Sequence, residues 1–282
     1  MEIGKYNELK FVKKSGAGLY FSDGKGEALL PYMEVPEGLQ ENDSLNLFVF
    51  LDGEDKPRAT IQKPLACVDE FVALTVVSEN ERGAYMDWGL SKDLFVPLRE
   101  QKTQMEIGEQ YLVYISLDRV NGRIIGSTKL TNFIELSDFD VKQGDEVELI
   151  IADRTDLGYN AIVNKKYMGL LYHNEVFEHL YPGDVKKGYI KQIREDDKID
   201  LSLQAIGYKQ VLDFKTTLLN QLEKNNGVLA LGDKSSPDEI LNELKVSKKI
   251  FKKTIGALYK ERLIDIFEKE IRLVNSDHLL GD

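Results

Sequence analysis

The stretch "GAYMDWGLSKDLFVP", residues 83–97, begins with a glycine and places two aromatic side chains, Tyr85 and Trp88, in a short alternating run. A polar turn follows, and a second apolar run closes with a proline. The same outline recurs at residues 18–31, "GLYFSDGKGEALLP", and at residues 158–172, "GYNAIVNKKYMGLLY", there without the proline. A hairpin that recurs three times in one chain indicates a tandem repeat of one small domain.

Each copy of the hairpin is flanked by further strand-like runs. One run precedes it, a longer one follows, and a tight polar turn leads to a last short run, such as "RIIGS" at residues 123–127. Five short strands in about 60 residues predict a small closed antiparallel barrel without exposed strand edges. We expect a short helical segment after the third strand and a bulge at the repeated glycine. Residues 131–140 predict a helical or extended linker between the second and third units.

The repeated unit resembles the S1 RNA-binding domain, a barrel of the OB-fold class. The resemblance rests on "RGAYMDWGLSKDLFVP" and "GEQYLVYISLDRVNGRIIGS", at residues 82–97 and 108–127. Each unit keeps the barrel pattern but lacks part of the family's RNA-binding set. The second-strand aromatic of the family falls on Tyr20, Tyr85 and, in unit three, Asn160. The late acid and base fall on Asp52 and Arg58, Asp118 and Arg123, and Ile193 and Lys198.

The resemblance places Tyr20 and Tyr85 on the outer face of their barrels. Barrels of this class stack the bases of a single strand on such aromatics and hold its phosphates with cations. Tyr85, Asp118 and Arg123 would form one RNA-binding patch. Alternatively, the tyrosines fill the core or a cross-strand position, and Asp118 pairs with Arg123 across a hairpin turn. Trp88 is expected in the core, because its position in the family holds an inward-facing aliphatic side chain.

The third unit has its own set of candidate contacts. An aromatic and a histidine end its third strand, and lysines are dense on its last two strands. A row of solvated lysines that bind nothing is the alternative interpretation. The candidates are Tyr172, His173, Lys186, Lys187, Lys191 and Lys198.

The C-terminal quarter differs from the rest in charge. Residues 207–282 hold 13 Lys and Arg against 12 Asp and Glu, a net charge of +1, whereas the rest holds 24 against 36, a net charge of −12. Apolar residues at helical spacing predict helices over residues 208–227, 236–245 and 246–263. A short strand-like run separates the first two helices, and residues 263–274 read as a hairpin. This order of elements predicts an α+β winged-helix domain.

The second and third of these helices carry local signals. Ser236 and Glu239 form a capping box at the start of the second helix. The third helix carries four lysines at spacings that place them on one face, which favours contact with nucleic-acid phosphates. A solvated basic face is the alternative. These lysines are Lys248, Lys249, Lys252 and Lys253, and the expected apolar stripe consists of Ile250, Phe251, Ile255, Leu258 and Tyr259.

The composition, 42% apolar and 30% charged, predicts a globular chain, and the sequence has neither a membrane-length apolar run nor a signal peptide. Cys67 is the only cysteine, so an intrachain disulfide is impossible and we expect a reducing cytoplasm. With three scattered histidines, we expect no metal and no cofactor. A Gly-rich phosphate loop, GxSxG and HExxH are all absent, so we expect no enzymatic activity.

Three S1-like units followed by a winged helix resemble the CvfB (conserved virulence factor B) family of bacterial cytoplasmic proteins. The resemblance implies an RNA-binding, non-enzymatic regulatory protein, and tandem barrels favour single-stranded RNA over duplex DNA. Two alternatives stay open: a scaffold of acidic barrels that docks on a ribosome or polymerase surface, and a DNA-binding regulator led by the winged helix. We expect a monomer with domains at residues 1–64, 65–130, 138–207 and 208–282.

Overall fold

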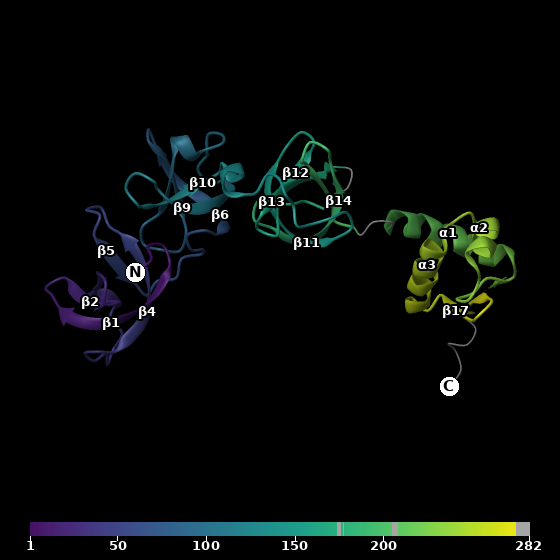
Figure 1. Cartoon of the computed structure of the whole chain (residues 1–282), viewed down its shortest axis with the longest axis horizontal. Coiled ribbons are helices and arrows are strands. Elements are labelled where there is room, and N and C mark those ends of the chain that lie inside the picture. The colour runs from purple at the N-terminus through teal and green to yellow at the C-terminus, as the bar shows by residue number, and fades with distance from the viewer. Residues whose placement is uncertain (174–175, 177, 205–207, 275–282) are drawn as a thin grey trace. The chain divides into compact units, whose positions relative to one another are not determined.

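The computed structural model describes residues 1–173, 176, 178–204 and 208–274. The chain divides into two compact units, residues 1–203 and residues 204–282. Figure 1 shows that strands build the first unit and that the helices α1 to α3 lie in the second. Three five-stranded barrels follow one another in the first unit, which confirms the predicted mainly β architecture.

Barrel one is closed, in the strand order β1-β2-β3-β5-β4. Its closing pair, β3 with β5, is parallel, so the prediction of a purely antiparallel barrel is wrong at this seam. A short 3-10 helix follows the third strand at Tyr32–Glu34, as expected. The strands are β1 (Tyr6–Lys14), β2 (Gly18–Ser22), β3 (Glu27–Pro31), β4 (Ser44–Leu51) and β5 (Pro57–Thr60).

Barrel two repeats this topology with one difference. Its strands form an open sheet in the order β10-β9-β6-β7-β8, and among the described strands β8 and β10 share no ladder. A 3-10 helix follows the third strand at Leu98–Glu100, and another, Leu130–Phe133, begins the linker. The strands are β6 (Phe71–Asn80), β7 (Gly83–Asp87), β8 (Leu94–Pro97), β9 (Gln110–Leu117) and β10 (Ile124–Ser127).

Barrel three is closed like barrel one, in the order β11-β12-β13-β15-β14, with a parallel closing pair between β13 and β15. The strands are β11 (Glu146–Arg154), β12 (Gly158–Val163), β13 (Tyr167–Tyr172), β14 (Val185–Ile193) and β15 (Ile199–Ser202).

The repeated glycine begins the second strand of each barrel and allows a close backbone approach. A Cβ atom at Gly83 would lie 2.2 Å from the carbonyl oxygen of Val96, and one at Gly158 would lie 1.9 Å from that of Leu171. The bulge predicted at this glycine lies instead in the first strand, opposite the second. It falls between Phe11 and Lys13, between Val76 and Ser78, and between Ile151 and Asp153.

Trp88 is a core residue, as predicted, with 4% of its surface exposed. Its indole N–H donates a hydrogen bond to the carbonyl of Lys92 at 2.6 Å. Its ring meets Phe48 of barrel one edge to face, with centroids 5.8 Å apart. The core of barrel two therefore continues into barrel one, since Phe48 belongs to the same apolar cluster.

Barrels two and three are joined by a second apolar cluster, which β9 and the 3-10 helix of the linker form with β11 and β12. Leu112 and Leu130 pack there with Ile150, Ala152 and Ile162. Beside it, the Lys102 ammonium lies 2.9 Å from the Asp153 carboxylate. Apolar packing therefore continues from each barrel to the next, so the barrels are not connected by flexible linkers alone.

The second unit has the predicted order of helix, strand, helix, helix and hairpin. Its core is built from the apolar faces of all three helices and the small sheet β16-β18-β17. The predicted capping box is confirmed, because Ser236 and Glu239 exchange both hydrogen bonds. The elements are α1 (Tyr208–Lys224), β16 (Val228–Leu229), α2 (Pro237–Leu244), α3 (Lys248–Lys260), β17 (Ile264–Ile266) and β18 (Ile271–Leu273).

Candidate nucleic-acid interface

Barrel two presents two neighbouring aromatic rings on its second and third strands. Tyr85 of β7 stands opposite Phe95 of β8, and the ring centroids are 5.1 Å apart. Both rings are half-buried, and the side-chain amide of Asn80 lies 3.2 Å from the Tyr85 hydroxyl. The sequence pattern predicted Tyr85 but not Phe95, although both residues lie in the hairpin of residues 83–97.

The corresponding positions in the other two barrels are already occupied. In barrel one, the Lys13 ammonium lies over the Tyr20 ring, 4.8 Å from its centroid. In barrel three, the Asn160 amide donates to Asp153 at 3.1 Å. In barrel two the residue opposite Tyr85 is Ser78, which cannot cover the ring as a cation does. Of these three equivalent positions, that of barrel two carries an aromatic ring over which no described cation lies.

Asp118 and Arg123 line the same cavity as Tyr85, but they do not pair with each other. Asp118, 8% exposed, accepts a hydrogen bond from the Arg99 guanidinium at 2.7 Å. The Arg123 guanidinium instead reaches barrel one, where it donates to Asp55 at 2.7 Å and to the Gly53 carbonyl at 2.8 Å. The alternative of an Asp118–Arg123 pair across the hairpin is therefore wrong, because Arg123 is held by the neighbouring barrel.

The Asp118 carboxylate stays charged in its buried position. The Val120 backbone N–H donates to it, and this hydrogen bond together with the Arg99 guanidinium lowers the pKa of Asp118 despite burial. Asp52 of barrel one is similar: its hydrogen bond with Arg58, followed by backbone N–H donors, lowers its pKa to about 2.

Barrel three carries the ion pair of barrel one with its charges reversed. Gln192 stands opposite Asp200, as Phe50 stands opposite Arg58 in barrel one, and Arg194 donates to Asp200 at 2.8 Å. The assignment of the family's acid and base to Ile193 and Lys198 is thus wrong by one and two residues. The base precedes the acid here, which reverses the order of charges in the family's pattern and hides this pair in the sequence.

The predicted contacts of barrel three are largely engaged with other residues of the barrel. Arg194 also donates to the Tyr172 hydroxyl, and a ring nitrogen of His173 lies 3.0 Å from the Thr155 carbonyl oxygen. Each of three lysines has an acidic partner within 3 Å, and Lys191, near the end of β14, is exposed and also engaged in an interaction. These ion pairs are Lys186–Glu178 at 2.7 Å, Lys187–Glu146 at 2.8 Å and Lys198–Asp196 at 2.6 Å.

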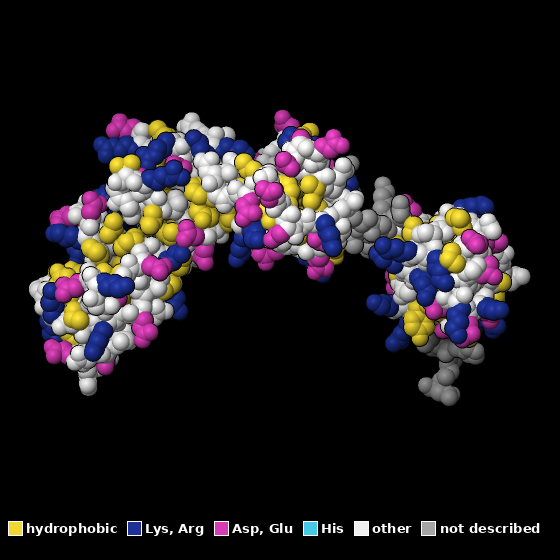
Figure 2. Space-filling model, in the orientation of Figure 1, with side chains coloured by type: hydrophobic (Ala, Val, Ile, Leu, Met, Phe, Trp, Pro, Cys, Tyr) yellow, Lys and Arg dark blue, Asp and Glu magenta, His cyan; other side chains and the backbone are white. Residues whose placement is uncertain are grey.

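The predicted lysine face of α3 divides into engaged and available side chains. Lys252 is paired with Asp233 at 2.9 Å, and Lys248 is half-buried. Lys249 and Lys253 are exposed, as is Lys260 two turns further along the helix, and none has an acidic partner within the described part of the chain. Figure 2 shows Lys and Arg side chains over the visible face of this unit.

The apolar stripe of α3 differs from the prediction at one residue. Phe251, Ile255 and Leu258 are buried and Ile250 packs beside them, as expected. Tyr259 is 56% exposed, so its assignment to the core is wrong. Its position on the helix, one residue past the buried Leu258, turns the ring toward solvent near Lys260.

The S1 domain family matches residues 3–62 and 70–129, and the CvfB-like winged helix domain matches residues 216–273. Conserved virulence factor B of Staphylococcus epidermidis ATCC 12228 is 24% identical over 281 residues, which cover 96% of this chain and 94% of the relative. The chain has S1 domains followed by a CvfB-like winged helix domain.

Other relatives span the chain in the same way. The uncharacterized protein YitL of Bacillus subtilis strain 168 is 25% identical over 271 residues, covering 92% of this chain and 90% of YitL. A solved structure of a multidomain protein with nucleic acid binding domains from Streptococcus pneumoniae TIGR4 is 21% identical. It covers 96% of this chain and 98% of that chain, with a TM-score of 0.41.

The described residues of this chain contain no group of three or more His, Cys, Asp or Glu side chains placed to hold a metal ion. Within the same residues, no helix is both long and apolar enough to span a membrane. The S1 barrels and the winged helix are domain types associated with nucleic-acid binding, and their exposed aromatics and lysines lie on the elements described above.

Proposed function

We propose that this protein binds single-stranded RNA and regulates it without catalysing a reaction. The observation that carries the proposal is the Tyr85–Phe95 pair on the outer face of barrel two. Aromatic side chains on these strands of OB-type barrels stack unpaired bases, and each stack contributes about 1–3 kcal/mol. A duplex keeps its bases stacked inside, so such a face favours a single strand.

Two cations stand beside this aromatic pair to receive phosphates. Arg82 precedes β7 and Lys92 precedes β8; both are exposed, and neither has an acidic partner among the residues that the structure describes. Tyr20 with Lys13, and Tyr172 with Arg194, supply weaker stacking positions on the flanking barrels, because a cation already covers each ring.

The winged-helix unit provides the main electrostatic anchor in this proposal. The rest of the chain carries a net charge of −12 and repels phosphates at long range, whereas residues 207–282 carry +1. Lys249, Lys253 and Lys260 present ammonium groups that are free to contact phosphates, and the exposed Tyr259 lies on the same helix.

The class of nucleic acid is the first property to test. The whole chain should bind a short single-stranded RNA at least tenfold more tightly than a duplex DNA of equal length, because stacking on Tyr85 and Phe95 requires unpaired bases. Fluorescence anisotropy at two salt concentrations measures both affinities. Equal or tighter binding of the duplex would contradict the proposal and favour a DNA-binding regulator led by the winged helix.

The aromatic face of barrel two can be tested by truncation. Tyr85→Ala and Phe95→Ala should each weaken binding of single-stranded RNA by about 1–3 kcal/mol, the value of one base stack. Both rings are half-buried, so the melting temperature should fall only slightly. Tyr181→Ala is the matched control, since Tyr181 is 63% exposed on barrel three. A sharp fall in melting temperature with unchanged affinity would show that Tyr85 serves only the fold.

A further inference from the structure

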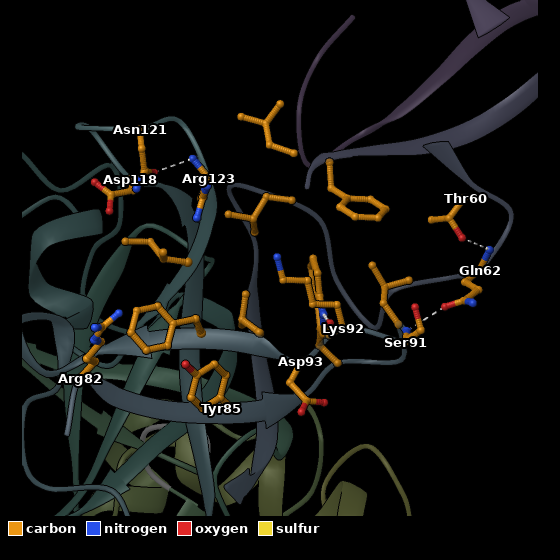
Figure 3. A pocket seen from close by; sticks show the side chains of 18 of the residues that line it. Thr60, Gln62, Arg82, Tyr85, Ser91, Lys92, Asp93, Asp118, Asn121 and Arg123 are labelled. Atoms are coloured by element: carbon orange, nitrogen blue, oxygen red, sulfur yellow. Dashed lines mark hydrogen bonds between the residues drawn. The ribbon is translucent and has the colours of Figure 1, made fainter. Parts of the chain in front are cut away.

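A cavity of about 330 Å³ lies between barrels one and two. Two polar contacts cross between the barrels at this cavity. The Arg123 guanidinium donates to Asp55, and the Ser91 backbone N–H donates to the Gln62 side-chain oxygen at 2.8 Å. Figure 3 shows Thr60 and Gln62 on one side of the cavity and Arg82, Tyr85, Asp118 and Arg123 on the other.

Both barrels contribute apolar and aromatic walls to the cavity. Phe50 and Leu51, at the end of β4, come from barrel one, while Tyr85, Trp88 and Phe95 come from barrel two. Figure 2 shows apolar side chains gathered over this junction. The aromatic face of barrel two thus continues into the cavity instead of ending on the open surface.

The cavity also lies at the open seam of barrel two. Leu94 and Phe95 of β8 line it together with Ile124 and Ile125 of β10, the two strands that share no ladder. In barrels one and three, a parallel pair closes the corresponding seam. In barrel two, β8 and β10 meet through side chains instead, and a Cβ atom at Gly126 would lie only 2.9 Å from a methyl group of Val96.

The charged groups of the cavity suit an anion at its edge. Arg82 and Lys92 have no acidic partner in the described part of the chain. Two of the acids are already engaged: Glu34 accepts from Thr60 and from the Ile61 backbone N–H, and Asp118 accepts from Arg99. Asp93 is the remaining acid, and it is exposed beside Lys92.

We propose that this inter-barrel cavity takes one unpaired nucleotide of the bound RNA. Its base enters between the walls of the two barrels and packs on Tyr85 and Phe95, and its phosphate stays outside with Arg82 and Lys92. The volume lies at the lower end of the range of about 300–1,000 Å³ for ligand pockets, which suits one nucleotide. This inference rests on the proposed function, because the nucleotide belongs to the RNA strand.

Trp88 makes the occupancy of the cavity directly measurable. It is the only tryptophan of the chain, and it lines the cavity. A short single-stranded RNA should therefore change the emission of Trp88, corrected for nucleotide absorbance, at the same concentrations at which anisotropy of a labelled RNA reports binding. Free adenosine and uridine monophosphates are tested separately, and they should act only at much higher concentration.

Leu51 allows two opposite changes of the cavity from the barrel-one side, away from the stacking face itself. Leu51→Phe enlarges the side chain and fills part of the cavity, so it should abolish the Trp88 response. It should also weaken RNA binding about tenfold, within the range for one lost base stack. Leu51→Ala shrinks the side chain and widens the cavity, so it should keep the Trp88 response. Both variants change the packing of the same residue. A general loss of stability would therefore weaken RNA binding in both variants and not in Leu51→Phe alone.

The outcomes separate this inference from the proposed function. RNA binding without a Trp88 response, with Leu51→Phe equal to the parent chain, overturns the cavity inference and leaves single-strand binding intact. A Trp88 response to free mononucleotides without any RNA binding overturns both, because the cavity would then serve a free nucleotide. The inference is supported if Trp88 emission and RNA anisotropy change over the same RNA concentrations, and if the Trp88 response is lost in Leu51→Phe but kept in Leu51→Ala.

Discussion

Trp88→Ala should lower the free energy of unfolding of the barrel unit by about 3–5 kcal/mol, the usual cost of truncating a large buried aromatic. The side chain is 4% exposed and packs on Phe48 across the junction of barrels one and two. Its loss also leaves the Lys92 carbonyl without its indole donor. For a unit of this size the melting temperature should fall by roughly 6–20 °C, which scanning calorimetry measures.

Two comparisons serve as controls for the stability change of Trp88→Ala. Trp88→Phe keeps an aromatic ring but removes the N–H, so its melting temperature should lie between those of Trp88→Ala and the parent chain. The transition of the winged-helix unit should stay in place, because the core of that unit is built from residues 214–273. A change in the free energy of unfolding below about 1 kcal/mol would show that the Phe48–Trp88 contact does not hold the barrels together.

Changing Lys249, Lys253 and Lys260 of α3 to Gln should weaken binding of single-stranded RNA on the order of tenfold to a hundredfold, as three exposed charge contacts at about 0.5–1 kcal/mol each imply. The slope of log affinity against log salt should flatten by about 2, since each phosphate contact on a single strand contributes about 0.7. The helix should remain folded, because Gln has nearly the helix propensity of Lys. Anisotropy titrations between about 50 and 200 mM salt measure both effects.

The matched control for α3 removes the same charge elsewhere in the same unit. Lys224, Lys234 and Lys245, changed together to Gln, lie outside α3 and should leave the salt slope nearly unchanged. Lys252→Gln should have a small effect by itself, because its ammonium is already paired with Asp233. If this control variant flattened the salt dependence as much as the α3 variant does, the lysines of α3 would be a solvated face. The scaffold alternative would then fit this unit better.

The sequence determined the features that depend on neighbours along the chain. The alternation and turns of residues 83–97, repeated at residues 18–31 and 158–172, predicted three five-stranded barrels. The capping box of Ser236 and Glu239 depends on residues three apart, so it could be read directly. Burial of Trp88 was expected from its family position, which holds an inward-facing aliphatic side chain, and the structure confirms it. Such features are encoded locally, because backbone geometry and short-range hydrogen bonds define them.

The tertiary structure alone decided which side chains meet across barrels. Arg123 pairs with Asp55, 68 positions earlier in the chain, and no period or motif relates the two residues. Phe48 and Trp88 share one core for the same reason, and Lys13 covers Tyr20 because a bulge in β1 brings it opposite. Contacts of this kind depend on how whole barrels pack. The accessible aromatic face of barrel two and the cavity beside it therefore emerged only from the folded chain.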